Sequence, residues 1–146
     1  MSPTRSNPTR ANLGFLLAKA SQRWNELLAA EFAAAGYPEV RPAYGSILLP
    51  LWEEDDLRMG ELGRRARLAK QTMTTMVRLM ERDGLVSRAP DPDDRRAQRV
   101  RLTKRGRDLR KIARKVLAAL DRRVSERLSE REIATFESCL QEVMSL

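Results

Sequence analysis

The chain has 146 residues, of which 42% are hydrophobic and 5% aromatic, and it carries a formal net charge of +8 at pH 7. This length and hydrophobic content suit one domain, or one protomer of a small oligomer, and argue against a wholly disordered chain. With no histidine and one cysteine, Cys139, the sequence excludes histidine-based catalytic triads, zinc clusters and disulfides within the chain. We therefore expect no metal and no cofactor.

The positive charge is concentrated in the middle of the chain. Residues 58–111 contain 17 Lys or Arg and 7 Asp or Glu, whereas the remainder contains 11 and 13. Such a basic segment predicts a polyanion partner, here double-stranded DNA. No apolar run approaches the roughly 20 residues of a membrane span, and residues 1–10 lack a signal-peptide core. We expect a cytoplasmic protein that has no membrane partner.

The N-terminal part predicts an arm followed by one long helix. Residues 1–10, with Pro3 and Pro8, are expected to be disordered. Apolar residues at helical spacing then run from Asn12 to Ala35, and Gly36 with Pro38 beyond it is a typical helix end. So long an apolar stripe has no partner in a lone small domain. Residues 11–40 are therefore predicted to form an N-terminal dimerisation helix.

A shorter helix is predicted next. Pro42 suits a first helical position, and Pro50 predicts a kink or an early end near Leu49, since proline lacks the N–H that a helix interior needs. The acidic run 53–56 predicts a solvated loop. Residues 57–59 predict a short strand that pairs with a β-hairpin.

Two further helices have the pattern of a helix-turn-helix. Residues 60–67 predict the supporting helix. After Ala69 the apolar residues Met73, Met76, Val77 and Met80 recur at i, i+3, i+4 and i+7, as on the buried face of a helix. The opposite face offers polar groups that suit base edges and phosphates: Gln pairs with adenine, Arg with guanine, and Thr offers a methyl or a hydroxyl. The candidate DNA-binding residues on this helix are Lys70, Gln71, Thr72, Thr74, Thr75 and Arg78.

A hairpin is predicted after this helix, which Asp83-Gly84 terminates. Two β-like runs, 85–88 and 99–102, flank turn-forming residues between Pro90 and Asp94. Two helices and a hairpin with a basic tip indicate a winged helix-turn-helix. The predicted fold class is mainly α with a small β-hairpin wing, and residues 41–103 are the predicted DNA-binding lobe.

The C-terminal part predicts two helices. Thr103 is a suitable N-cap for a long helix to about Arg127, and Ser129 with Glu132 forms a capping box that begins the last helix. The last helix carries apolar residues from Ile133 to Met144. Residues 104–146 are therefore predicted to be the C-terminal dimerisation helices that flank the lobe together with the N-terminal one.

Three motifs keep register across residues 40–110: Gly84-Leu85-Val86-Ser87-Arg88, Asp91-Pro92-Asp93-Asp94-Arg95-Arg96, and Leu102-Thr103-Lys104-Arg105-Gly106. With Glu61-Leu62 and the helix over 71–81, this stretch resembles the MarR (multiple antibiotic resistance regulator) family of dimeric bacterial transcription factors. The resemblance implies a homodimer on a pseudo-palindromic operator. It also implies that Arg96 enters the minor groove, braced by Asp94, which agrees with the negative potential of a narrow groove.

Other wing arginines, namely Arg88, Arg95, Arg99 and Arg101, are expected to contact phosphates. The chain departs from the family at Gly63, where alanine is usual, and at Arg67, where glycine is common. The usual N-cap residues are also absent at Arg58 and Ala69. These departures affect the expected helix boundaries more than the expected fold.

The resemblance also implies a repressor that a small aromatic or phenolic effector releases. Candidate ligand-binding residues are Arg23, Trp24, Tyr44 and Trp52, although aromatic residues at helical spacing are also typical of a plain core. A redox-responsive regulator that uses Cys139 is an alternative, and a passive interface thiol is favoured over it.

Two other classes of function stay open. A winged-helix protein–protein adaptor would dock an acidic partner on the basic face and bind DNA without regard to its sequence. An enzyme would need a lysine or carboxylate mechanism, because the chain has no histidine and no Gly-rich phosphate loop. We therefore predict that the protein is not an enzyme.

Overall fold

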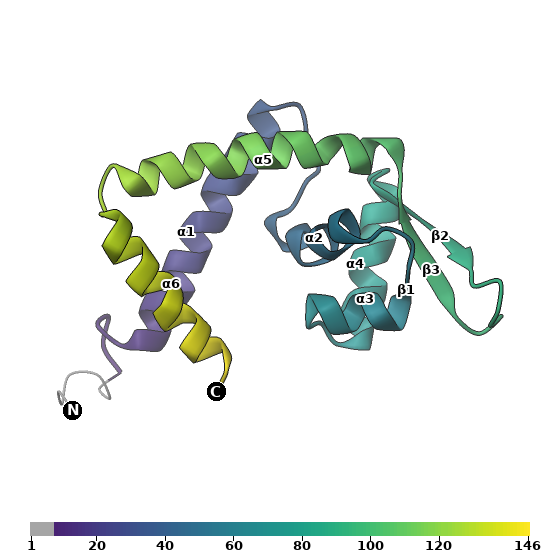
Figure 1. Ribbon diagram of the computed structural model, residues 1–146, viewed down its shortest axis with the longest axis horizontal. Coiled ribbons are helices and arrows are strands. Elements are labelled where there is room, and N and C mark those ends of the chain that lie inside the picture. The colour runs from purple at the N-terminus through teal and green to yellow at the C-terminus, as the bar shows by residue number, and fades with distance from the viewer. Residues whose placement is uncertain (1–7) are drawn as a thin grey trace.

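The computed structural model describes residues 8–146 of the chain (Figure 1). Most of this part is helical, with one small antiparallel sheet. The elements in chain order are α1 (Leu13–Ala34), the 3-10 helix η1 (Pro42–Tyr44), α2 (Gly45–Glu53), β1 (Leu57–Arg58), α3 (Met59–Ala66), α4 (Lys70–Arg82), β2 (Val86–Pro90), β3 (Gln98–Leu102), α5 (Lys104–Ser125) and α6 (Glu130–Met144). This is the predicted fold class, a winged helix-turn-helix flanked by N- and C-terminal helices. Residues 1–7 of the predicted disordered arm lie outside the described residues.

Side-chain capping begins three helices, and the sequence predicts two of these caps, Thr103 and Ser129. The Asn12 side chain accepts from the N–H of Gly14 at the start of α1, and Thr103 Oγ1 accepts from the N–H of Gly106 at the start of α5. Ser129 and Glu132 form the reciprocal capping box of α6. Gly84, at φ 77°, follows α4 in the left-handed region that favours glycine.

Of the two outcomes predicted near Leu49, a kink or an early end, the early end is wrong. Helix α2 continues to Glu53 with Pro50 inside it, and the N–H of Glu54 closes it on the carbonyl of Pro50 at 2.9 Å. Leu48 and Leu51, on either side of the proline, are buried in the core. Burial of these side chains offsets the one helix hydrogen bond that proline removes.

The predicted solvated loop over 53–56 holds for residues 54–56, of which Glu54 and Asp55 are exposed, whereas Glu53 is the last residue of α2. Two carboxylates of this loop also bind the wing. Asp55 Oδ1 accepts from the N–H of Leu102 at 2.9 Å, and Asp56 Oδ1 accepts from Arg101 Nε at 2.8 Å. These carboxylates bind the end of the hairpin because β1 directly follows them and pairs with β3, as predicted. The acidic run thus neutralises part of the wing instead of facing water alone.

The sheet has the order β1-β3-β2 with both pairs antiparallel. The hairpin register places Val86 opposite Leu102 and Pro90 opposite Gln98, so β2 extends to Pro90, a residue that the sequence places in the turn. Val100 on the central strand is fully buried, and it faces the core with Val86 and Leu102. The wing is therefore anchored at its base and extends away from the helices (Figure 1).

One apolar core lies within the lobe and continues along α5. Its most buried residues come from α2, α3, α4, the wing and α5: Ile47, Leu62, Val77, Met80, Leu85, Val100 and Leu109, each with no measurable exposure. Helix α5 runs from this core to the other end of the molecule, where α1 and α6 lie (Figure 1). The long helix thereby fixes the reading lobe relative to the terminal helices. None of the helices in residues 8–146 combines the length and apolarity that a bilayer crossing demands.

Candidate nucleic-acid interface

One face of helix α4 packs into the core, and the opposite face is largely exposed to solvent. Met73, Val77 and Met80 are buried, whereas Gln71, Thr72 and Arg78 are exposed. Lys70 and Thr75 are exposed as well, and Thr74 is half-buried. The polar face predicted for this helix therefore exists as one surface, because the apolar residues recur with the period of an α-helix.

Two threonines of this face already use their hydroxyl protons. Thr74 Oγ1 donates to the carbonyl of Lys70 at 3.0 Å, and Thr75 Oγ1 donates to the carbonyl of Gln71 at 3.1 Å. This back-bonding is the usual conformation of threonine within a helix. Each side chain then offers its methyl group and the lone pairs of its oxygen, but no free donor, to a partner.

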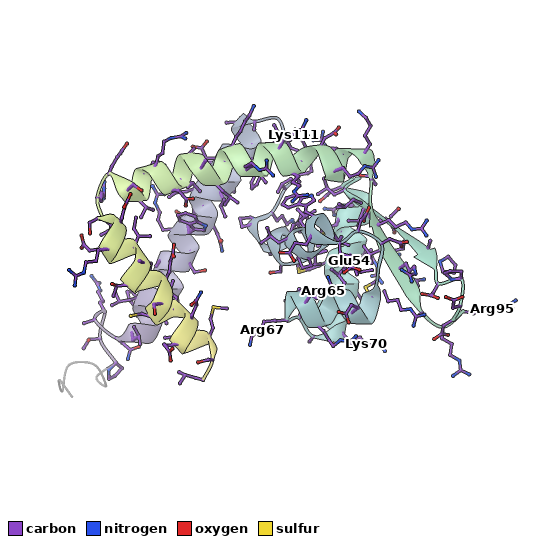
Figure 2. The ribbon with its side chains drawn as sticks, viewed as in Figure 1. Glu54, Arg65, Arg67, Lys70, Arg95 and Lys111 are labelled. Carbon is purple, nitrogen blue, oxygen red and sulfur yellow. The ribbon has the colours of Figure 1, made fainter. Side chains whose placement is uncertain are left out.

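The turn before α4 contributes a cation, Arg67, that is not among the DNA-binding residues predicted from the sequence. Arg67 ends α3 in the left-handed conformation, at φ 55°, and its side chain is exposed. Figure 2 shows Arg67 and Lys70 at the lower edge of the lobe. A basic residue at the turn of a helix-turn-helix is the signal that could have identified Arg67. Gly63 permits the tight packing beneath it, since a Cβ there would lie 3.2 Å from Met73 Cγ.

A buried carboxylate organises the base of the wing tip. The Asp91 side chain has no exposure, and it accepts from Arg58 Nε at 2.7 Å and Arg99 Nε at 3.0 Å. It also accepts from the main-chain N–H groups of Asp93 and Asp94. The N–H of Asp93, together with the guanidinium of Arg58, holds the pKa of Asp91 below its usual value despite burial. The ionised carboxylate of Asp91 thus links the strand residues Arg58 and Arg99 to the main chain of the wing turn.

The wing arginines fall into two groups. Arg88 pairs with Glu81 at 3.1 Å, and this hydrogen bond lowers the pKa of Glu81. Arg99 and Arg101 are held by Asp91 and Asp56. Arg95 and Arg96 are exposed at the tip, and within the described part of the chain their guanidinium groups have no ion-pair partner.

Asp94 acts on Arg96 through the backbone. Its Oδ1 accepts from the main-chain N–H of Arg96 at 3.0 Å, which is a local turn of the kind that aspartate favours. The guanidinium of Arg96 therefore stays free of the other residues between 8 and 146. Figure 2 shows the neighbouring Arg95 extending from the wing tip away from the helices.

A groove of about 850 Å³ separates the helix-turn-helix from the wing. Its lining includes Arg67, Lys70 and Thr74 on the helical side and Arg88 and Arg96 on the wing side, with apolar residues such as Met59, Leu68 and Met73 between them. It is therefore a cationic concavity between the two predicted reading elements. A negatively charged strand or small anion is the partner that such walls attract.

The four residues predicted for an effector do not line this groove. Tyr44 is buried and its hydroxyl donates to Asp83 Oδ2 at 2.6 Å, and Trp52 Nε1 donates to the carbonyl of Gly106 at 2.9 Å. Both rings thus join the core and tie elements together. Arg23 is exposed and pairs with Glu26 on α1, where Trp24 is half-buried. Cys139 is exposed on α6, far from these aromatic residues in sequence.

Comparison with known protein families gives one match. Residues 42–97, which include the whole helix-turn-helix and the wing as far as the residue before β3, match the MarR family model. The HTH-type transcriptional repressor Rv2887 of Mycobacterium tuberculosis is 35% identical over 117 residues, which cover 74% of this chain and 84% of that protein. The HTH-type transcriptional regulator TtmR of Methylorubrum extorquens is 41% identical over 64 residues, which cover 44% of this chain and 33% of TtmR. These relatives are transcriptional regulators, not enzymes.

Solved structures share the fold. A mutant MarR from E. coli, complexed with operator DNA, superposes with a TM-score of 0.78 at 24% identity, covering 90% of this chain and 92% of that one. The PcaV regulator from Streptomyces coelicolor, in complex with its natural ligand, superposes with a TM-score of 0.80 at 23% identity, covering 96% of this chain and 97% of that one.

Proposed function

The chain belongs to the MarR family of DNA-binding transcriptional regulators, and from this premise we propose that it is a repressor that holds its operator as a homodimer. Each protomer reads the major groove with the polar face of α4 and the minor groove with Arg96.

The observation that carries it is the distribution of uncompensated positive charge. Arg88, Arg99 and Arg101 are paired within the chain, whereas Arg95 and Arg96, among residues 8–146, are left free at the wing tip. Lys70 and Arg67 stand across the groove from Arg96. A phosphate backbone that follows this surface meets free cations on both sides, which is the footprint expected of a DNA-binding lobe.

The roles of the individual side chains follow from their free groups. Gln71 and Arg78 have unused donors and suit adenine and guanine. The hydroxyl groups of Thr74 and Thr75 donate to main-chain carbonyls of α4. Each side chain can therefore offer its methyl group to thymine or accept a hydrogen bond from a base amino group. Arg95 and Lys70 contact phosphates. Arg88, Arg99 and Arg101 act by shaping the hairpin more than by direct contact.

Homodimer formation is supported by the terminal helices. No residue of α6 is buried, and Phe136 and Met144 remain 50% and 62% exposed. On α1, Leu13 and Leu16 are also more than half exposed. Helices with such apolar faces need a partner to bury them. We assign residues 11–40 and 104–146 to the dimerisation helices, which meet the second copy through the exposed apolar residues of α1 and α6, and residues 41–103 to the DNA-binding lobe.

Release by a small molecule is the remaining part of the proposal. The relative Rv2887 is named a repressor, and PcaV is a structural neighbour with a bound natural ligand. In this chain the groove between α4 and the wing shares Lys70 and Arg96 with the proposed DNA contacts. An anion in the groove would compete with the operator for these two cations.

The test is selection of bound fragments from random DNA, followed by footprinting of the selected sequence. A two-fold dimer should protect two half-sites about 10 base pairs apart, centre to centre. A single protected half-site bound by a monomer would contradict the dimer. Binding that is weak, salt-sensitive and indifferent to sequence would instead favour the protein–protein adaptor.

A further inference from the structure

A second cationic surface lies on α5, outside the reading lobe. Residues 104–115 contain seven basic residues and one acidic residue, Asp108, and all eight are exposed. Lys111, Arg114 and Lys115 form its C-terminal part. We call these three residues and Lys104 and Arg107 the α5 ridge, because the 3- and 4-residue steps between them follow one helix face.

The ridge lies on the opposite side of the molecule from the reading surface. Figure 2 shows Lys111 on the upper side of α5, whereas Arg67 and Lys70 are at the lower edge of the lobe. Leu109, Ala113 and Val116 turn the other face of α5 into the core. A duplex gripped by α4 and the wing therefore leaves the α5 ridge free.

Contacts within the chain do not neutralise the ridge. Lys104 is 3.5 Å from Asp108, and Arg107 donates to the carbonyl of Leu102 at 3.0 Å. Lys111, Arg114 and Lys115 have no ion pair or hydrogen bond from their side chains anywhere in residues 8–146. Arg107 with Lys111, and Lys111 with Lys115, are like charges at i, i+4, an arrangement that weakens a helix. A surface needed only for solubility would interleave acids at these positions.

We propose that the α5 ridge binds the phosphate backbone of a second DNA segment, without sequence preference, while the reading helices hold the operator. From Lys104 to Lys115 the helix rises about 16 Å, at 1.5 Å per residue. On duplex DNA this length meets about five phosphates of the nearer strand, at 3.4 Å per phosphate. The proposal rests on the proposed function only in placing the operator on the other face.

The chemistry of the ridge favours a duplex over other polyanions. Its exposed face holds charged side chains only, because the apolar residues between Lys104 and Lys115 turn toward the core. A membrane-surface helix needs an exposed apolar face to insert, and a protein interface needs a buried aromatic or aliphatic centre. A purely electrostatic row is sufficient for phosphate backbones.

The test uses the full-length protein bound to a short, immobilised operator duplex and measures capture of a second, labelled duplex of random sequence. Wild type should capture it. The variant K111Q/R114Q/K115Q should bind the operator as wild type does but capture the second duplex about tenfold less or worse, with a salt slope smaller by about 3. None of the three side chains has a partner within the described part of the chain, so the fold should be kept.

A matched control removes the same charge elsewhere. The variant R123Q/R127Q/R131Q alters three exposed arginines beyond the ridge, and it should capture the second duplex like wild type. Three results would overturn the proposal: no capture by the wild-type complex, equal capture by both triple variants, or wild-type binding to phosphatidylserine vesicles in preference to the random duplex. Loss of operator binding by wild type would contradict the proposed function instead. In that case the ridge is tested by comparing the affinity of wild type and of K111Q/R114Q/K115Q for a random duplex, and wild type should bind it more tightly.

Discussion

Single arginines of the wing have different roles because different neighbours hold them. Arg101 donates to Asp56 at 2.8 Å, whereas Arg96 receives only a backbone brace from Asp94 among the described residues and keeps its guanidinium free. A guanidinium in an ion pair must give up its partner before it can meet a phosphate, and a free one need not. The free residue should therefore contribute more to DNA affinity.

We expect Arg96→Ala to lower the operator affinity by about 1–3 kcal/mol and to reduce the salt slope by about 1. Fluorescence anisotropy across a salt series measures both. Arg101→Ala is the matched control on the same hairpin and should change affinity less. Equal losses for the two variants would remove the distinction between paired and free arginines.

Tyr44 gives a pH dependence of stability whose sign can be worked out. Burial, and then the hydrogen bond to Asp83, raise the pKa of Tyr44 from 10 to about 12. Because the folded state holds the proton more tightly, the stabilisation is complete below pH 10 and is lost as pH rises toward 12. The unfolding free energy should fall there by about 1.4 kcal/mol per pH unit.

The measurement is urea unfolding between pH 9 and 12, compared with Tyr44→Phe. Every other titratable group is the same in both proteins, so the difference between the two curves isolates Tyr44. The variant should lose this part of the slope and also the late tyrosinate absorbance. Parallel curves for the two proteins would show that Tyr44 ionises alike in the folded and unfolded states.

At the scale of elements, the junction between the wing and α5 depends on one glycine. Thr103 Oγ1 donates to the carbonyl of Gly84 at 2.6 Å and accepts from the N–H of Gly106 at 3.1 Å. This brings the first turn of α5 against the Leu85 carbonyl, so closely that a Cβ on Gly106 would overlap it. The close approach explains why the motif that begins with Leu102-Thr103 ends in glycine.

Gly106→Ala should therefore destabilise the protein by about 1–3 kcal/mol, the usual cost of overpacking. Gly60→Ala is the control, because a Cβ there meets nothing within 4 Å and alanine favours the helix α3. Thermal or urea unfolding of both variants checks the prediction. A Gly106→Ala protein with the unfolding free energy of wild type would mean that the start of α5 can shift away from the Leu85 carbonyl without loss of stability.

At the scale of the whole molecule, α5 joins a well-packed lobe to the terminal helices α1 and α6, whose apolar residues remain exposed in a single chain. Phe136 on α6 is half exposed, and the proposed second copy would bury it. Phe136→Glu should weaken dimerisation by about a hundredfold or more, since burial of such a side chain contributes about 1.5–3 kcal/mol and a two-fold dimer carries two copies of it.

Sedimentation equilibrium of wild type and variant measures this effect. Leu49→Glu is a suitable control, because Leu49 is 52% exposed but lies on α2 in the lobe. It should leave association unchanged. A wild-type protein that stays monomeric at micromolar concentration would remove the basis for a two-fold grip on the operator.

Much of the fold could be predicted because its signals are local. Thr103 and Ser129 cap their helices as predicted, and Gly84 follows the end of α4 as predicted. The polar face of α4 was predictable for the same reason, since helical periodicity places Gln71 and Arg78 opposite Met73 and Val77. The family was also predictable, since three motifs of the wing and its flanks keep register. The assignment of particular residues to DNA remains a prediction.

The sequence by itself thus determined the order of elements, their boundaries within a few residues, the helix faces and the basic character of the lobe. These follow from capping, periodicity and turn chemistry, which act over a few neighbouring residues. Only the tertiary structure decided which cations are free. Arg101 meets Asp56 across 45 positions of sequence, and Pro50 stays helical because distant side chains bury its neighbours. Pairing and burial depend on the folded path of the chain, which composition and spacing do not specify.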